Sequence, residues 1–303
     1  MKDKETMTEK NSDQKRADRK DILKYMAQFL NIERQFPLLP GTKDVGIVAK
    51  FIGIEPQELI DIRSYFDDQV KKAALEMLKD ETTIEQIQQL PFKKNDKIIV
   101  LGDSITDDLQ SWFEIFVHML EIALPDQELS FMNASLSGDS SYNALKRFDR
   151  DVIAQNPDWV IISLGTHDAE RPNYAANRTM VSLTEFWENL NTLGLAVKDI
   201  TKNPVIWITP PPVIEEMMDE SPEFNTIIQE KDLIQYRDVI SGKSGYIVDP
   251  LGNRMGRPPE AWNYLNDGLH PSLAGHVQTV KALLKALTNV SEDDHDHDHD
   301  EED

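Results

Sequence analysis

Cysteine is absent from this chain of 303 residues. Its absence excludes disulfide bonds, thiolate metal sites and a cysteine nucleophile, and it favours a cytoplasmic protein. Long apolar runs are absent as well. No window approaches the ~18 uninterrupted apolar residues of a membrane helix, and residues 1–21 contain no apolar core of a secretory signal. We therefore expect a cytoplasmic protein without a membrane span.

Basic residues are scarce. The chain has 32 Lys and Arg against 54 Asp and Glu, so its formal net charge is −22. Nine carboxylates lie in residues 292–303, interleaved with His295, His297 and His299. So acidic a chain is a poor candidate for binding nucleic acid or an anionic membrane. The isolated tail offers no preformed coordination geometry, so we expect neither a metal site nor a cofactor.

Four regions follow from the pattern of polar and apolar residues. We expect residues 1–20 to be disordered, residues 21–95 to be helical, residues 96–290 to form an α/β domain, and residues 291–303 to form a solvated acidic tail. Within residues 43–68 the lengths also suit a helix-turn-helix, but that stretch has more acidic than basic residues, which disfavours DNA binding. The remaining interpretations of the helical segment are a lid, a prop or a dimerisation element. The last of these would make the protein a homo-oligomer.

The pattern of polar and apolar residues changes at Lys97. Short apolar runs separated by helical patterns occupy residues 97–101, 129–134, 159–164, 204–209 and 245–249. Ser182 and Glu185 form a capping box before one of these helical patterns. After the first run, a helix is expected to begin at Asp107 and Asp108. Near-continuous apolar strands that alternate with helices indicate a five-stranded parallel sheet covered on both faces, an α/β fold.

Polar clusters follow the first three apolar runs and precede the last helix. They are Gly102-Asp103-Ser104, the loop around Gly138, Gly165-Thr166-His167-Asp168, and Asp267-Gly268-Leu269-His270. Ligands of open parallel sheets bind beyond the carboxyl ends of the strands, where these clusters are expected to lie. Taken singly, each cluster is also typical of an ordinary turn.

Ser104 needs a base if it is to act as a nucleophile. His270 lies in a loop, three residues after Asp267. A carboxylate at that spacing can fold back on one imidazole nitrogen and leave the other nitrogen for the serine. The four clusters in this order are a more specific signal for a nucleophilic Ser104 than any one motif.

In this order of motifs the chain resembles the SGNH/GDSL hydrolases over roughly residues 97–287. The resemblance implies a flavodoxin-like, three-layer α/β/α fold and ester hydrolysis through an acyl-serine. It implies Ser104 as nucleophile, His270 as base and Asp267 as its orienting carboxylate. It also implies an oxyanion hole made by the backbone N–H groups of Ser104 and Gly138 and by a third donor. That donor is an asparagine in the family, and His167 stands in its place here.

The leading hypothesis is a serine esterase whose partner is a small-molecule ester with a short acyl group, acetyl among the candidates. A lysophospholipase or acyl-thioesterase is the second. A catalytically weak SGNH-like binding or regulatory module is a third hypothesis of a different class, motivated by His167.

Overall fold

The computed structural model describes residues 22–175, 177–219, 226–250, 255–256 and 258–288. The two segments expected to be disordered or solvated, 1–20 and 291–303, lie outside these ranges. The helices before the sheet occupy residues 22–29, α2 Ile32–Gln35, η1 Pro40–Lys43, α3 Val45–Ile52, α4 Pro56–Met77 and α5 Glu81–Gln88. The chain therefore enters its first strand only after a wholly helical stretch, as expected.

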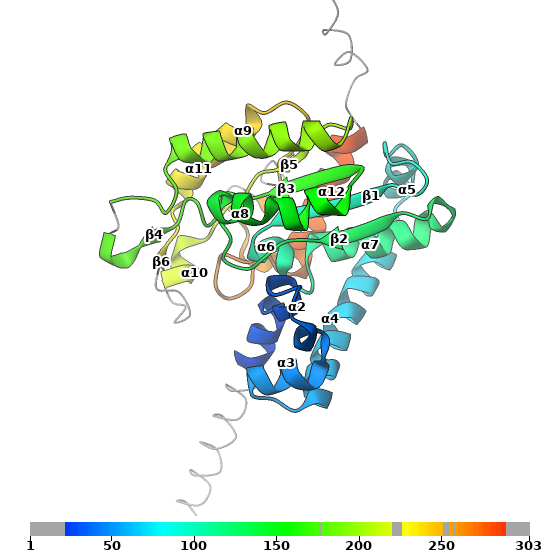
Figure 1. Ribbon diagram of the computed structural model, residues 1–303, viewed down its shortest axis with the longest axis horizontal. Helices are drawn as coiled ribbons and strands as arrows, with labels where there is room; N and C mark the ends of the chain where they lie inside the picture. Colours follow the sequence, from blue (N-terminus) through cyan, green and yellow to red (C-terminus); the bar gives the residue numbers. More distant parts are fainter. Residues whose placement is uncertain (1–21, 176, 220–225, 251–254, 257, 289–303) are drawn as a thin grey trace, which may run out of the picture.

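A five-stranded sheet forms the centre of the molecule (Figure 1). Its order is β2-β1-β3-β5-β7, and every pair of neighbours is parallel. This is the flavodoxin-like order, so the predicted five-stranded parallel α/β fold is confirmed. The strands are β1 Lys97–Gly102, β2 Ser130–Asn133, β3 Trp159–Ser163, β5 Ile206–Ile208 and β7 Tyr246–Val248. All five predicted strands are present, and their ends lie within two residues of the expected ones.

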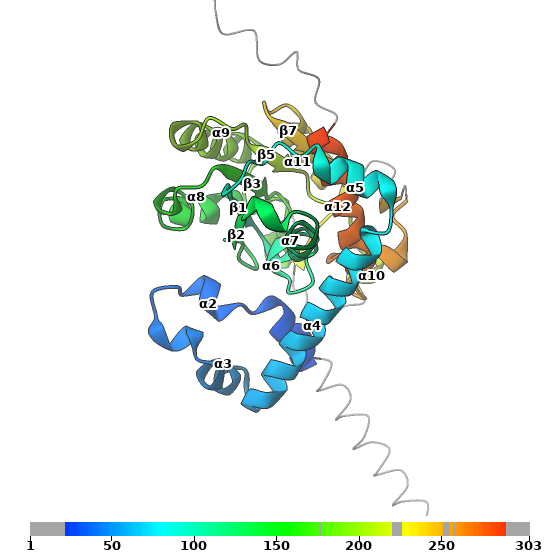
Figure 2. The ribbon, with the colours of Figure 1, turned by 90° about the vertical axis from the view of Figure 1, so that its right-hand side faces the viewer.

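Helices cover both faces of the sheet (Figure 2). On one face pack α8 Ser141–Asp151, α9 Leu183–Ile200 and α11 Glu230–Ser241, and on the other pack α7 Trp112–Ala123 and α12 Leu273–Thr288. Successive residues of β1 alternate between the two apolar cores, Ile99 with the first and Ile98 with the second. Both faces are buried, which explains why the strands read as continuous apolar runs. The capping box of Ser182 and Glu185 begins α9 as predicted.

Short elements complete the fold around the ends of the strands. An antiparallel pair joins β4 Arg171–Pro172 to β6 Thr226–Ile227 outside the main sheet. The remaining elements are α6 Ser104–Asp107, η2 Pro125–Gln127, η3 Ile153–Gln155, η4 Asn173–Ala175, α10 Glu215–Asp219 and η6 Ala261–Asn263.

The helical segment has a small core of its own. Its helix α3 begins where the Asp44 carboxylate accepts the N–H of Ile47, and it ends at Gly53, whose φ of 85° suits glycine. Helix α4 takes part in two cores. Leu59 near its start belongs to the segment's own cluster, whereas Val70 farther along packs against α7 in a core of the sheet. Helix α4 thus fastens the helical segment to the α/β domain.

The chain after β1 corrects one expectation. The helix predicted to begin at Asp107 and Asp108 is split, because α6 ends at Asp107 and α7 begins at Trp112 with Ser111 as its N-cap. The carboxylates of Asp107 and Asp108 are buried and accept hydrogen bonds from Asn31, Arg34 and Gln28 of the helical segment. These acidic residues therefore hold two parts of the molecule together instead of starting a helix.

Candidate active site

Ser104 stands at the carboxyl end of strand β1, which lies between β2 and β3 in the sheet. The Asp103 side chain caps α6 by accepting the N–H of Ile105 at 3.1 Å, which holds Ser104 at the first position of that helix. Gly102 leaves no room for a side chain, since a Cβ would lie 3.0 Å from the carbonyl oxygen of Ser163. Burial raises the pKa of Asp103, against the lowering effect of His167. The local sequence thus presents the serine on a tightly packed turn.

A relay of hydrogen bonds links Ser104, His270 and Asp267. The Ser104 Oγ lies 2.8 Å from His270 Nε2, and His270 Nδ1 lies 2.8 Å from Asp267 Oδ2. The other carboxylate oxygen, Asp267 Oδ1, accepts the backbone N–H groups of Leu269 and His270. Ser104 and His270 are only 5% and 4% exposed. This geometry suits transfer of the serine proton to Nε2.

The charge of Asp267 is well compensated. Burial raises its pKa, but the hydrogen bonds and charge of His270 outweigh that effect, so the pKa lies below its usual value. The turn that closes the pair requires Gly268, whose φ is 65° and whose added Cβ would meet the Ile214 carbonyl oxygen at 2.5 Å. Asp267 is therefore an ionised partner held in one position.

A second histidine, His167, lies beside the same serine. His167 Nε2 is 3.4 Å from Ser104 Oγ, and its Nδ1 is 2.8 Å from Glu170 Oε2. Burial lowers the pKa of His167, but the Glu170 hydrogen bond and nearby carboxylates raise it more, so it lies above the ordinary value. Gly138 has a φ of 83°, with open space beside its Cα.

Asp168, the neighbour of His167, is bonded to the start of α8. Its carboxylate accepts the N–H of Ser141 at 2.9 and 3.0 Å and also the Ser141 hydroxyl, at the start of α8. Burial raises the pKa of Asp168 to about 6. Asp168 therefore ties the loop after β3 to the loop after β2.

Sequence reasoning missed three residues of this site. Glu170 pairs with His167 at the same three-residue spacing that had drawn attention to Asp267 and His270. The three-residue spacing of His167 and Glu170 is the signal in the sequence that could have identified this pair. Tyr25 and Phe29 come from the helical segment, and no local pattern connects them with the serine.

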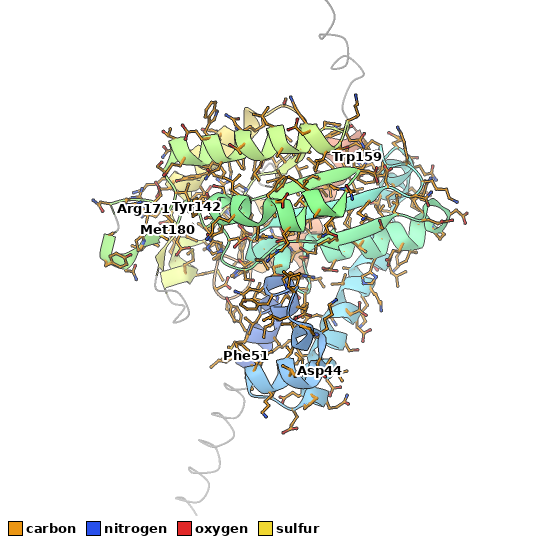
Figure 3. All side chains as sticks on the ribbon, in the orientation of Figure 1. Asp44, Phe51, Tyr142, Trp159, Arg171 and Met180 are labelled. Carbon is orange, nitrogen blue, oxygen red and sulfur yellow. The ribbon has the colours of Figure 1, made fainter. Side chains whose placement is uncertain are left out.

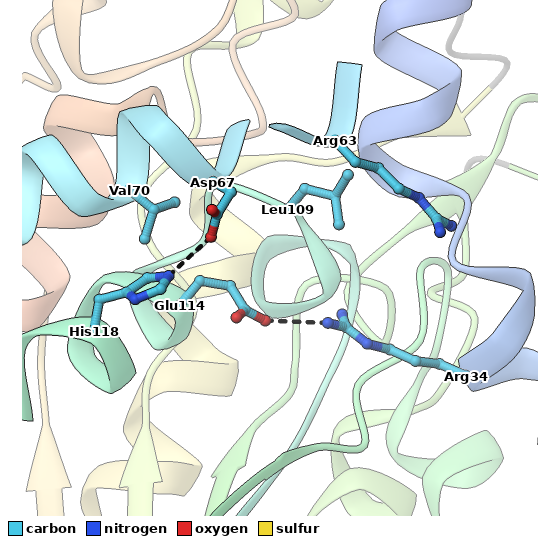
Figure 4. A pocket seen from close by; sticks show the side chains of 7 residues that line it. All are labelled: Arg34, Arg63, Asp67, Val70, Leu109, Glu114 and His118. Atoms are coloured by element: carbon cyan, nitrogen blue, oxygen red, sulfur yellow. Dashed lines mark hydrogen bonds and ion pairs between the residues drawn. The ribbon is translucent and has the colours of Figure 1, made fainter. Parts of the chain in front are cut away.

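A separate pocket of about 130 Å³ lies where the helical segment meets α7 (Figure 4). Hydrogen bonds of 3.0 Å between Arg34 and Glu114 and of 3.1 Å between His118 and Asp67 cross it. Its lining consists of Arg34, Arg63, Asp67, Val70, Leu109, Glu114 and His118, none of which belongs to the serine relay. The pocket is therefore a feature of the join between the two regions.

Two further observations concern the part of the chain that the structure describes. None of its helices is both long enough and apolar enough to cross a bilayer. Within the same residues, no group of three or more His, Asp or Glu side chains is arranged to hold a metal ion.

Comparison with known proteins relates this chain to esterases. The model of the GDSL-like lipase/acylhydrolase family matches residues 100–278. An acetylxylan esterase of Geobacillus stearothermophilus is 26% identical over 214 residues, which are 63% of this chain and 94% of the relative. An arylesterase of Vibrio mimicus is 35% identical over 80 residues, which are 25% of this chain and 40% of the relative.

The fold agrees with these matches. The crystal structure of Axe2, an acetylxylan esterase from Geobacillus stearothermophilus, superimposes with a TM-score of 0.53 at 24% identity, covering 64% of this chain and 95% of Axe2. At that identity the superposition supports the fold alone. The family model, however, matches more than half of the chain, so the protein belongs to the GDSL-like lipase/acylhydrolase family and is a hydrolase of ester bonds.

Proposed function

We propose that the protein is a serine esterase that removes short acyl groups, acetyl first among them, through an acyl-serine intermediate. The observation that carries the proposal is the continuous relay from Ser104 through His270 to Asp267, with both contacts at 2.8 Å. Acetyl is favoured because the relative matched over most of its length is an acetylxylan esterase. The nearly buried serine also favours a small acyl group.

Each atom of the relay has a role in this mechanism. His270 Nε2 accepts the Ser104 proton as Oγ attacks the ester carbonyl, and it returns that proton to the departing alcohol. Water then attacks the acyl-serine by the same route, releasing the acid. Asp267 accepts the Nδ1–H of His270 and stabilises the imidazolium. Structures of Axe2 described as catalytic mutants replace a serine, an aspartate or a histidine, the last two three positions apart, which is the spacing of Asp267 and His270.

His167 is proposed as the third oxyanion donor, beside the N–H groups of Ser104 and Gly138. The contact with Glu170 decides in which form it donates. A neutral ring whose Nδ1–H points at the Glu170 carboxylate has a bare Nε2 toward Ser104. Only the imidazolium carries a proton on both nitrogens. The raised pKa of His167 favours that cationic form, which strengthens the donor where negative charge develops.

The test is a series of p-nitrophenyl esters from acetyl to long acyl chains, assayed with the wild type and with Ser104→Ala. The proposal predicts the highest kcat/KM for acetyl and loss of turnover in the variant. A maximum at long acyl chains would favour the lysophospholipase alternative. A higher kcat/KM for the thioester with the same acyl group, assayed in parallel, would favour the thioesterase. Equal turnover by wild type and variant would contradict a serine mechanism. A wild-type rate no higher than the uncatalysed rate would favour the binding module.

A further inference from the structure

Two aromatic residues of the helical segment reach the serine relay. The Tyr25 hydroxyl donates to Asp267 Oδ2 at 3.3 Å, from 242 positions away in the sequence. The Phe29 ring centroid lies 4.3 Å from that of the His270 imidazole, at an interplanar angle of 39°. The two aromatic rings also contact each other, with centroids 4.9 Å apart. A region outside the α/β domain therefore touches both the base and its carboxylate.

The chain at Gln28 and Phe29 is anchored. Gln28 donates from Nε2 to both carboxylate oxygens of Asp108 at 2.9 Å, and its carbonyl accepts the N–H of Leu109. The Phe29 carbonyl accepts the Ser137 hydroxyl at 2.7 Å, beside the loop position of Gly138. Ala27, Gln28 and Phe29 are all buried, with Phe29 8% exposed. The contacts with the relay thus come from a fixed segment, residues 25–29, which we call the strap.

This strap is an addition to the region shared with the family. The family model begins at residue 100, and about two thirds of this chain already covers 95% of Axe2. Figure 2 shows α2, which follows the strap, close to α6 at the carboxyl end of the sheet. Tyr25 on the Asp267 carboxylate and Phe29 against the imidazole of His270 limit how far these two groups can move. Proton transfer depends on that fixed geometry.

We propose that Tyr25 and Phe29 complete the active site of this chain. The proposal rests on the proposed serine mechanism. Tyr25 is a positioning residue that holds Asp267 in line with His270. Phe29 orients the imidazole and walls the space beside it. Because the departing alcohol takes its proton from His270, that wall lies on the alcohol side of the ester and selects against bulky alcohols.

The experiment measures two quantities that do not depend on the fraction of folded enzyme. They are kcat per active site and the ratio of kcat/KM between two acetates. The rates of all variants that keep Ser104 are normalised to Ser104 titrated with a fluorophosphonate, and the rate of Ser104→Ala is normalised to total protein. Tyr25→Phe keeps the ring and removes the hydroxyl, and we expect kcat for p-nitrophenyl acetate to fall about three- to tenfold with KM within about twofold, as suits one long hydrogen bond to a charged group. Phe29→Ala and Phe29→Leu should raise kcat/KM for 1-naphthyl acetate relative to p-nitrophenyl acetate, by more in the alanine variant.

Matched controls lie on the same helical segment. Tyr65→Phe removes a hydroxyl from α4, where the ring contacts Phe66. Phe51→Ala truncates a phenylalanine of α3 that is 73% exposed and lies on the outer part of the segment (Figure 3). Neither control should change kcat or the ratio of the two acetates. A purely structural role for the strap would lower the thermal unfolding midpoint of the Phe29 variants and leave that ratio unchanged.

Every outcome decides the proposal. An unchanged ratio in Phe29→Leu, which keeps most of the buried volume, together with unchanged kcat in Tyr25→Phe would overturn it, even if Phe29→Ala does not fold. Turnover that requires Ser104 but ignores both aromatic residues refutes this inference alone. Turnover that survives Ser104→Ala refutes the serine mechanism, and this proposal with it.

Discussion

Two histidines face the same serine, and they are held differently. His270 lies 2.8 Å from Ser104 Oγ, its partner Asp267 is fixed by two backbone N–H groups, and the helical segment covers both. His167 lies 3.4 Å from the same oxygen, and the His167–Glu170 pair is more exposed than the His270–Asp267 pair. The closer, more rigid pair suits a base, and the more distant pair suits a donor to charge that develops later.

The largest predicted effect comes from removing the closer histidine. His270→Ala and Ser104→Ala should each lower kcat by about 10⁴-fold or more, because both act in one proton transfer. Asp267→Asn should lose less, since it disturbs the orientation of the base and leaves the base in place. Steady-state rates with p-nitrophenyl acetate measure these losses, and His118→Ala, a histidine of α7 outside the relay, serves as the control. Near-wild-type turnover in His270→Ala would reverse the assignment of the two histidines.

The second prediction concerns the more distant histidine. His167→Ala removes the proposed oxyanion donor, which can cost about 10²–10³ in turnover. His167→Asn restores an N–H donor of the family's type and should stay within about tenfold of the wild type. Single-turnover acylation rates separate this effect from product release. Equal losses in the alanine and asparagine variants would show that His167 does not donate to the oxyanion.

The third prediction distinguishes the pairs by pH. The pKa of His167 is raised, so its imidazolium persists to higher pH than usual and is lost as the pH rises through that value. The rate that depends on this donor should therefore decline on the alkaline side. Glu170→Gln removes the charge that supports the imidazolium and should move the decline to lower pH. In His167→Asn the decline should vanish.

The measurement is kcat/KM as a function of pH. Glu188→Gln, a charge removed from an exposed position of α9, provides the control. An alkaline limb that is the same in wild type, Glu170→Gln and His167→Asn would contradict the cationic donor.

The smallest predicted effect lies beside the His167 pair and concerns stability. Asp168 has a folded pKa of about 6, above the ordinary value of 3.8, so the folded state binds more protons between these values. Its contribution to stability is therefore greatest at low pH and falls as the pH rises through 6. Asp168→Asn removes this dependence, and the free energy of unfolding of the variant should improve relative to wild type by about 1 kcal/mol between pH 5 and 7. Urea unfolding at both pH values tests this, with the exposed Asp149→Asn as control.

Much of the fold could be predicted because its signals are local. Each strand is a short apolar run, and the capping box of Ser182 and Glu185 starts α9 within three residues of sequence. Ser104, Asp267 and His270 could be singled out because they stand at strand ends or before a helix. Parallel strands bring such positions to one edge. The division of the chain into domains at residues 20, 95 and 290 stays a prediction.

The sequence by itself determined the alternation of strands and helices, the turn that presents Ser104, and the pairing of Asp267 with His270 across Gly268. Only the tertiary structure decided that Asp107 and Asp108 bind the helical segment, and that Tyr25 and Phe29 reach the relay. The physical reason is distance along the chain. Periodicity shows which side of a helix is buried, but a hydrogen bond across 242 positions exists only when packing has placed two remote surfaces together.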